Sequence, residues 1–350
     1  MRRLVPLVVW GLVSLSCTSS SDVGEGTTAA GAARPARSSA PATTATTLPA
    51  SPAPPRGQLV VSATGDVNLD PGYIPALRTR GYEHAWSGLQ GIFQQDDLSI
   101  INLECAVSDL GVPEVKEFTF RCDPAALPAA RAAGVDVANM GNNHSGDFGK
   151  QALVDSRARL EQAGIAPVGA GADAATAHRP AVLAVDGWTV AVVGFGGVVP
   201  TPDWLATDRR PGMADGDTIE SMVAAVQAAD AVADIVVVSI HWGVELDTEP
   251  RQEDRARADA LIAAGADAIF GHHAHRLQPL EVVQGVPVAW GLGNFVWPNH
   301  SAAGSRTAVA QVVFAPDGAV TACLLPAVIE SAGHPVLQAA HDPAAPCPPV

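Results

Sequence analysis

The stretch Gln58–Asn68, QLVVSATGDVN, sets a pattern that the rest of the chain repeats. Its first part, Gln58–Ala63, is rich in β-branched and small side chains, as a buried strand is, and the polar group Gly65-Asp66-Val67-Asn68 follows almost at once. A lone Asp after a strand is more often a turn cap than a ligand. Asp66 therefore gains a functional meaning only if the pattern recurs.

Four further apolar runs end in polar clusters. They are Asn102-Leu103-Glu104 after Leu98–Asn102, Gly141-Asn142-Asn143-His144 after Val135–Asn139, His241-Trp242-Gly243 after Ile235–Ile240, and Gly271-His272-His273-Ala274-His275 after Ala268–Phe270. The carboxyl ends of neighbouring strands in an α/β sheet meet at one edge, where ligands bind. The recurrence therefore predicts that all five clusters share one crevice.

Residues 58–330 alternate short strand-like runs with helical patterns, which predicts an α/β domain. The remaining predicted strands are Ala181–Val185, Thr189–Gly194, Leu280–Val283, Val286–Trp290, Ala308–Phe314 and Val320–Leu325. The predicted helices are Ala125–Ala133, Lys150–Ala163, Thr218–Ala231 and Arg251–Ala264. Turns at Gln284-Gly285 and Asp317-Gly318 predict antiparallel additions to a parallel core.

The sequence predicts that neither end of the chain belongs to the folded domain. Residues 1–17 combine Arg2 and Arg3 with a short apolar run and Cys17, which predicts a signal peptide with lipidation at Cys17; cleavage with an incidental Cys is the alternative. Residues 18–57 are rich in Ser, Thr, Ala and Pro and predict a disordered linker. We expect residues 331–350 to be a loose C-terminal tail, and the protein to be exported and either membrane-anchored or secreted.

The charge balance restricts the partners. The chain has 21 Lys and Arg against 36 Asp and Glu, a formal charge of −15, which argues against nucleic-acid binding. An anionic substrate would need local positive charge, and bound metal ions supply it most economically.

The donor types in the clusters suit divalent Mn, Fe or Zn, because they combine carboxylate, amide and imidazole groups without Cys. One or two such ions can activate water and clamp the oxygens of a phosphoryl group. An imidazole that is not a ligand can then protonate the leaving group. Three His within four residues, His272, His273 and His275, are hard to explain without a metal.

The clusters, together with Gly291-Leu292-Gly293-Asn294-Phe295, resemble the capsule-synthesis CapA family associated with poly-γ-glutamate, whose members look like relatives of calcineurin-type metallophosphatases. The resemblance covers residues 58 to about 297. It implies a four-layer α/β/β/α sandwich of the metallo-dependent phosphatase type. It also implies a catalytic His144 and a set of metal ligands: Asp66, Glu104 as a bridge, Asn143, His241, His273 and His275.

The sequence departs from the metallophosphatase pattern at Asn68, where that pattern has His, which weakens the first metal position. Within Gly271–His275, either His272 or His273 can be the first ligand of the pair. We expect Asp147 and Glu245 to be orienting partners or turn caps, and Asn294 to line the site or to cap a strand.

The cysteines predict one disulfide beside the site. Cys105 and Cys122 stand where the resemblance implies Gly and a small residue, so their joint appearance suggests a bond that pins the loop next to Glu104. Two independent buried thiols are the alternative. Cys323 and Cys347 form a weaker candidate pair.

The first functional hypothesis is a metal-dependent hydrolase that acts on an anionic polymer or a phosphoester in the cell envelope. The second is a non-catalytic envelope factor that binds, or helps to export, an anionic polymer. A nucleotidase-like scavenger is a third reading, but the sequence offers no second domain for base recognition.

Overall fold

The computed structural model describes residues 56–342 and residue 347. The predicted signal peptide, the lipidation site at Cys17 and most of the linker lie outside these residues. Arg56 and Gly57, the last two linker residues, pack on the domain instead: Arg56 pairs with Asp234, and Trp188 Nε1 donates to the Gly57 carbonyl. Within the described part, no helix has the length and apolar character needed to cross a membrane.

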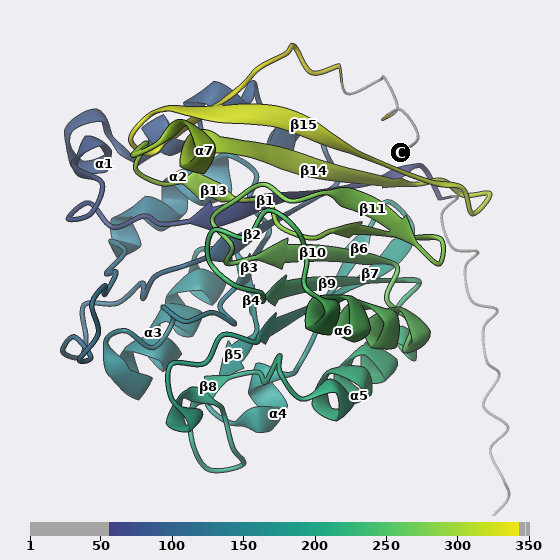
Figure 1. The fold of residues 1–350 in the computed structure, drawn as a ribbon, viewed down its shortest axis with the longest axis horizontal. Helices are drawn as coiled ribbons and strands as arrows, with labels where there is room; N and C mark the ends of the chain where they lie inside the picture. Colours follow the sequence, from purple (N-terminus) through teal and green to yellow (C-terminus); the bar gives the residue numbers. More distant parts are fainter. Residues whose placement is uncertain (1–55, 343–346, 348–350) are drawn as a thin grey trace, which may run out of the picture. The chain divides into compact units, whose positions relative to one another are not determined.

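An eight-stranded sheet carries the first sequence clusters (Figure 1). Its order is β16-β15-β14-β1-β2-β3-β4, and β13 pairs with β1. The strands are β1 Leu59–Val67, β2 Leu98–Leu103, β3 Val137–Asn139, β4 Ala166–Val168, β13 Asn294–Val296, β14 Arg306–Phe314, β15 Val320–Ser331 and β16 His334–Leu337. The pairs from β1 to β4 are parallel, and β14, β15 and β16 add antiparallel strands, as the turn at Gly318 predicts.

A six-stranded sheet carries the histidine clusters, in the order β11-β12-β10-β9-β7-β6. Its strands are β6 Ala181–Val185, β7 Trp188–Gly196, β9 Ile235–His241, β10 Ala268–His272, β11 Leu280–Val283 and β12 Val286–Ala289. The four central strands are parallel, whereas β6 and β11 are antiparallel edges. Gln284 and Gly285, both with positive φ, close the β11–β12 hairpin. A separate pair joins β5 Ala170–Gly171 to β8 Gly212–Met213.

Helices are short and lie between the strands. They are α1 Pro75–Arg80, α2 Leu127–Ala132, α3 Gly149–Gln162, α4 Ala174–Ala177, α5 Ile219–Asp230, α6 Gln252–Ala263 and α7 Ala302–Ser305, with 3-10 turns η1 Tyr82–Ala85, η2 Ser87–Leu89, η3 Ile92–Gln94, η4 Pro124–Ala126 and η5 Pro202–Trp204. Gly164 and Gly265 follow α3 and α6 with positive φ, as helix C-terminal glycines do. The predicted helix Ala125–Ala133 divides into η4 and α2.

The apolar residues form three main clusters, and these define four layers. One cluster joins the inner faces of the two sheets, for example Val61 of β1 with Val192 of β7 and Val237 of β9. A second packs α2 and α3 on the outer face of the eight-stranded sheet. The third packs α5 and α6 on the outer face of the six-stranded sheet (Figure 1). The α/β/β/α arrangement is therefore confirmed.

The expected loose tail is wrong for part of its length. His334–Leu337 forms β16 and pairs with β15, and Leu337 is buried. Cys347 forms a disulfide with Cys323 of β15. The sequence pattern did not predict this strand because it is only four residues long and contains Pro335, which an edge strand tolerates.

Candidate metal centre

The five sequence clusters meet at the carboxyl ends of the parallel strands of both sheets. Asp66 lies near the end of β1 in register with Asn102 of β2, and Glu104 follows β2 directly. In the other sheet, His241 ends β9 in register with His272 of β10. Asp66, Glu104 and His241 are fully buried. Each group therefore faces protein rather than bulk water.

Gly65 shows why this edge is so tightly defined. A Cβ at Gly65 would lie 1.9 Å from the Gly293 carbonyl oxygen, so only glycine fits where β1 passes the segment before β13. The Asp66 backbone N–H then donates to that same carbonyl at 2.8 Å. The glycine before Asp66 is thus required by close backbone approach, and it fixes where the carboxylate enters the site.

Two overlapping groups of side chains could hold metal ions. One consists of Asp66, Glu104 and His275, and the other of Glu104, His241 and His273; in each, the ligand atoms lie within 4.8 Å of one another. Glu104 Oε1 is 3.6 Å from His241 Nε2 and 4.0 Å from His275 Nε2. Glu104 is thus the residue that the two groups have in common.

The polar atoms at this edge lack partners, which tests whether a metal fits. Both carboxylate oxygens of Glu104 are buried without a hydrogen bond, as are Asp66 Oδ2 and the Nδ1 atoms of His273 and His275. Asp66 Oδ2 and His275 Nδ1 are 3.0 Å apart and form an ion pair when His275 is protonated, but their orientation does not suit a hydrogen bond. Unpaired buried oxygen and nitrogen acceptors are costly unless something else satisfies them. Divalent cations held by Asp66, Glu104 and His275 or by Glu104, His241 and His273 would give these atoms partners, so the donor set fits.

The protonation states point the same way. Burial, reinforced by the charge of Asp66, raises the pKa of Glu104 well above its usual value. Burial lowers the pKa of His273 to about 4 and that of His241 well below its usual value. His275 differs: burial opposes protonation, but Glu104 and Asp66 raise its pKa to about 9. In the absence of a cation, burial therefore disfavours charge on Glu104, His241 and His273, whereas the two carboxylates favour the protonated form of His275.

Amide side chains connect the two sheets. Asn102 Nδ2 donates to Asp66 Oδ1 at 2.8 Å and lies 3.1 Å from His241 Nδ1. Asn142 donates to Asn102 Oδ1 at 3.2 Å. Asn143 Oδ1 lies 2.8 Å from His241 Nε2, the same ring nitrogen that is 3.6 Å from Glu104 Oε1. Asn143 is therefore placed beside the second group, and its role as a ligand stays a prediction.

His144 lies between Glu104 and Asp147, and Asp147 orients its ring. Its Nδ1 is 2.7 Å from Asp147 Oδ2, and its Nε2 is 3.9 Å from Glu104 Oε1. Asp147 also accepts from Lys116 Nζ at 2.6 Å and from the Phe120 backbone at 2.7 Å. Burial lowers the pKa of His144, although Asp147 opposes the shift. The geometry matches the orienting role expected for Asp147.

The remaining candidates occupy different places. His272 Nε2 contacts the Ser239 hydroxyl at 3.0 Å, and its Nδ1 is 4.0 Å from Asp66, so the structure favours His273 as the first ligand of the pair. Asn68 Oδ1 accepts from the Asp70 backbone within its own turn. Glu245 is exposed and belongs to neither group. Asn294 pairs with Asp66 across β1 and β13, and its Oδ1 is buried without a partner.

Lys116 is the site residue that sequence reasoning missed. It stands in a polar loop with no preceding strand, where a single Lys carries no signal. Its ammonium nitrogen lies 3.3 Å from His144 Nδ1 and also donates to the Asn143 carbonyl. It therefore ties Asp147, His144 and Asn143 into one unit.

The loop beside Glu104 is closed by a disulfide between Cys105 and Cys122. The two Cα atoms are 5.6 Å apart, and both residues are buried. Because Cys105 directly follows Glu104, the bond restrains the backbone that presents the shared carboxylate.

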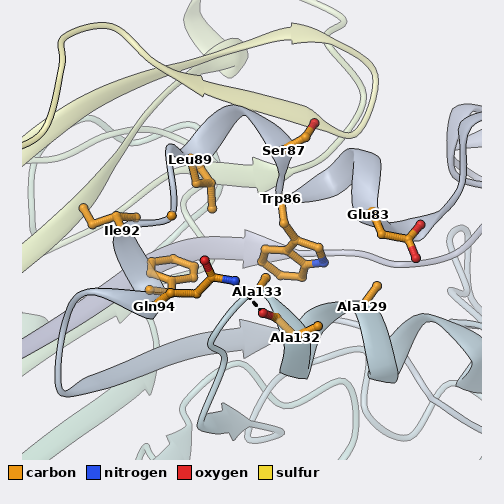
Figure 2. A pocket seen from close by; sticks show the side chains of 11 residues that line it. Glu83, Trp86, Ser87, Leu89, Ile92, Gln94, Ala129, Ala132 and Ala133 are labelled. Atoms are coloured by element: carbon orange, nitrogen blue, oxygen red, sulfur yellow. Dashed lines mark hydrogen bonds between the residues drawn. The ribbon is translucent and has the colours of Figure 1, made fainter.

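A hollow elsewhere lacks this chemistry. A cavity of about 340 Å³ lies between η1–η3 and α2. Figure 2 shows Trp86 in its wall and the hydrogen bond from Gln94 Nε2 to the Ala132 carbonyl. Glu83 is the one ionisable residue in its lining. With a single carboxylate and no imidazole, it does not compete with the strand ends as a catalytic site.

Residues 60–299 match the sequence profile of a family described as "Bacterial capsule synthesis protein PGA_cap". The match takes in more than half of the chain, and it contains every strand-end cluster described above.

Individual relatives agree with this match. A probable polyglutamine synthesis accessory protein of Mycobacterium tuberculosis is 36% identical over 211 residues, 57% of this chain and 55% of the relative. The PGA biosynthesis protein CapA of Bacillus subtilis is 31% identical over 242 residues, 68% of this chain and 63% of that protein. The chain therefore matches less than two thirds of the length of either relative.

Among solved structures, the NAD nucleotidase NadN of Haemophilus influenzae superposes with a TM-score of 0.46 and 13% identity, over 77% of this chain and 56% of that chain. A likeness of this strength adds nothing to the fold described above.

Proposed function

The chain belongs to the PGA_cap family of bacterial capsule synthesis proteins, and from this premise we propose that it is a metal-dependent hydrolase of the metallophosphoesterase type. Its substrate would be an anionic polymer or a phosphoester of the cell envelope. The observation that carries the proposal is the position of Glu104, which is shared by two groups of potential ligands and is buried without any other partner.

The residues divide into two holding groups in this proposal. Asp66, Glu104 and His275 would hold one divalent ion, and Glu104, His241 and His273 would hold the other, with Asn143 beside His241. When bound, such ions supply Lewis-acid activation of water and stabilise negative charge on the reacting group. Burial lowers the pKa of both His241 and His273, which favours the uncharged imidazole that a cation binds. His273 Nδ1 has no other partner, whereas His241 Nε2 would exchange its contact with Asn143 for the cation.

His144 would transfer the proton that the leaving group needs. The contact between Asp147 and Nδ1 fixes the ring, so that Nε2 is the nitrogen directed into the centre. Lys116 holds Asp147 from the other side at 2.6 Å. Proton transfer requires an oriented donor within reach of the leaving oxygen, and this arrangement provides the orientation.

The test is metal content together with turnover. Protein loaded with Mn, Fe or Zn should bind two equivalents per chain and hydrolyse a generic phosphodiester or phosphomonoester. His144→Ala should keep both equivalents and lose about a hundredfold or more in kcat. Loss of metal in His144→Ala, to the same degree as in Asp66→Ala, would contradict the role given to His144.

A non-catalytic envelope factor is the second candidate, and Asn68 favours it. The metallophosphatase pattern has an imidazole there, whereas the Asn68 oxygen is used by the Asp70 backbone. One metal equivalent with no turnover of any phosphoester, combined with binding of an anionic polymer, would support this function instead.

The proposal includes a location at the outer face of the cytoplasmic membrane or in the cell wall. It rests on the signal-like residues 1–17 and the linker composition that follows. Fractionation of the expressing cells tests it: wild-type protein should sediment with membranes, and Cys17→Ser should move to the soluble exported fraction. Retention of both forms in the cytoplasm would contradict the proposed location.

A further inference from the structure

A small cavity lined by two arginines adjoins the metal centre. It measures about 250 Å³ and is lined by Thr248, Arg276, Leu277, Ala303 and Arg306. None of these five residues is acidic. In a chain with a formal charge of −15, two guanidinium groups around one cavity are a local exception.

The cavity is tied to the centre through the backbone. Arg276 directly follows His275, and its Nη1 donates to the His275 carbonyl at 2.7 Å. The same Nη1 lies 3.4 Å from where a Cβ would stand at Gly304. The Gly304 carbonyl in turn accepts from Asn294 Nδ2 at 2.9 Å, and Asn294 pairs with Asp66. The cavity is therefore connected to the centre on two sides, through Arg276 to His275 and through Gly304 and Asn294 to Asp66.

The charges of the two arginines are not neutralised by neighbouring side chains. Within residues 56–342 and 347, neither Arg276 nor Arg306 forms an ion pair with a carboxylate. By contrast, Arg251, Arg255 and Arg257 are each paired with an acid. Guanidinium groups that keep free donors bind carboxylate and phosphate oxygens through parallel hydrogen bonds.

We propose that Arg276, Arg306 and Thr248 form a subsite that holds one oxyanion group of a polyanionic substrate while a neighbouring unit of the same polymer lies at the Asp66–Glu104 centre. The inference rests on the proposed function, because it assigns the substrate of that site. The cavity has the volume for a single carboxylate or phosphate group with its attachment, and its two guanidinium groups select for negative charge. The protein would then recognise the polymer by the distance between its successive negative charges.

The experiment measures binding rather than turnover. A γ-linked glutamate oligomer is titrated calorimetrically into the metal-loaded protein, with a polyphosphate chain as the second anionic probe and the amidated oligomer as the neutral one. Arg306→Gln and Arg276→Gln should each weaken binding of the anionic probe about tenfold, the double variant more, and Arg306→Lys less. Metal content should not change in any of them.

Arg179→Gln provides the matched control. Arg179 is exposed before the edge strand β6, and its guanidinium group donates to the Thr176 hydroxyl. The Arg179→Gln variant loses the same positive charge as the two cavity variants, and it should bind the oligomer as the wild type does. Binding of polyphosphate alone, still dependent on the two arginines, supports the subsite with phosphate as its group.

Three results would overturn the subsite: unchanged affinity in both arginine variants, an equal loss in Arg179→Gln, or equal binding of the amidated oligomer. Absence of wild-type binding to both anionic probes would overturn it as well. Because no step of this test needs hydrolysis, arginine-dependent binding without phosphoester turnover would reject the proposed enzyme and leave the subsite standing.

Discussion

The two sheets contribute different chemistry to the same edge. The eight-stranded sheet supplies oxygen donors, Asp66 from β1 and Glu104 after β2, whereas the six-stranded sheet supplies imidazoles, His241 from β9 and His273 after β10. The oxygen side brings negative charge that burial disfavours, and the nitrogen side brings rings that burial keeps neutral. His275 is the exception, because Glu104 and Asp66 raise its pKa to about 9 and it pairs with Asp66 at 3.0 Å. A bound cation would replace that proton as the positive charge facing the two carboxylates.

The two sides are also held in place differently. On the oxygen side, a disulfide follows Glu104 and an amide donates to Asp66. On the nitrogen side, His273 and His275 have positive φ values of 91° and 51°. Left-handed conformations cost non-glycine residues about 1–3 kcal/mol each, and they persist mainly at functional sites. The oxygen side is thus reinforced, and the nitrogen side is strained.

The largest expected effect comes from the carboxylate that both ligand groups share. Glu104→Gln should lower the affinity for both metal equivalents more than about a hundredfold, because it removes the charge that the two groups have in common. Inductively coupled plasma mass spectrometry after dialysis measures the metal that remains per chain. In metal-free protein the same variant should unfold at an equal or higher temperature, since the buried carboxyl oxygens have no partner to lose.

Glu220→Gln, an exposed change on α5, is the control and should alter neither property. If Glu104→Gln retained one tightly bound equivalent, the shared position of the carboxylate would not describe how the two sites form.

The imidazole side should divide into two halves. His241→Ala should remove one metal equivalent and His275→Ala the other, because each ring belongs to only one of the two groups. Each variant is the matched control for the other, and metal stoichiometry with anomalous scattering locates the ion that remains. Complete loss in both variants would mean that the two ions bind only together.

A smaller effect is expected where the two sides are joined. Asn102→Ala removes the amide that donates to Asp66 and lies 3.1 Å from His241 Nδ1. Partners that orient ligands are typically worth 10–100-fold in metal affinity, so we expect about tenfold weaker binding at unchanged stoichiometry. A competition titration with a chelator measures it. A change in stoichiometry would instead make Asn102 a ligand.

Much of the fold could be predicted from the sequence, because most strands are apolar runs, and the central ones, such as β9 and β10, are buried on both faces. β6 and β11 have the predicted bounds, and β9 extends its prediction by one residue. The strands missed are short and carry little hydrophobic pattern: β4 contains Pro167, β16 contains Pro335, and β13 has three residues. Their pairing depends on neighbours remote in sequence, which no local pattern encodes.

The site shows the same division. The strand-end clusters indicated which segments converge, since parallel strands end at a common edge. They left open which of His272 and His273 faces the centre, because a left-handed residue at position 273 redirects the chain in a way that alternation does not predict. Lys116 reaches His144 from a loop without any pattern of its own. Convergence was therefore predictable, and orientation was not.

The smallest effect on metal binding should come from the disulfide, although its effect on folding is large. Replacing Cys105 and Cys122 with Ser opens a loop of sequence separation 17, which should lower the free energy of unfolding by about 3 kcal/mol. Metal affinity should fall only a few-fold, because the Glu104 backbone N–H also donates to the Val67 carbonyl at 2.8 Å. This hydrogen bond holds Glu104 at the edge of the sheet without the disulfide. Replacing Cys323 and Cys347 with Ser is the matched control: it removes a bond from β15, which lies between β14 and the edge strand β16, and should lower stability without changing metal affinity. Chemical denaturation and chelator competition on the two double variants separate the effects. An equal loss of metal affinity in both would show that the oxygen side responds to overall stability alone, and the local reinforcement at Glu104 would have no separate role.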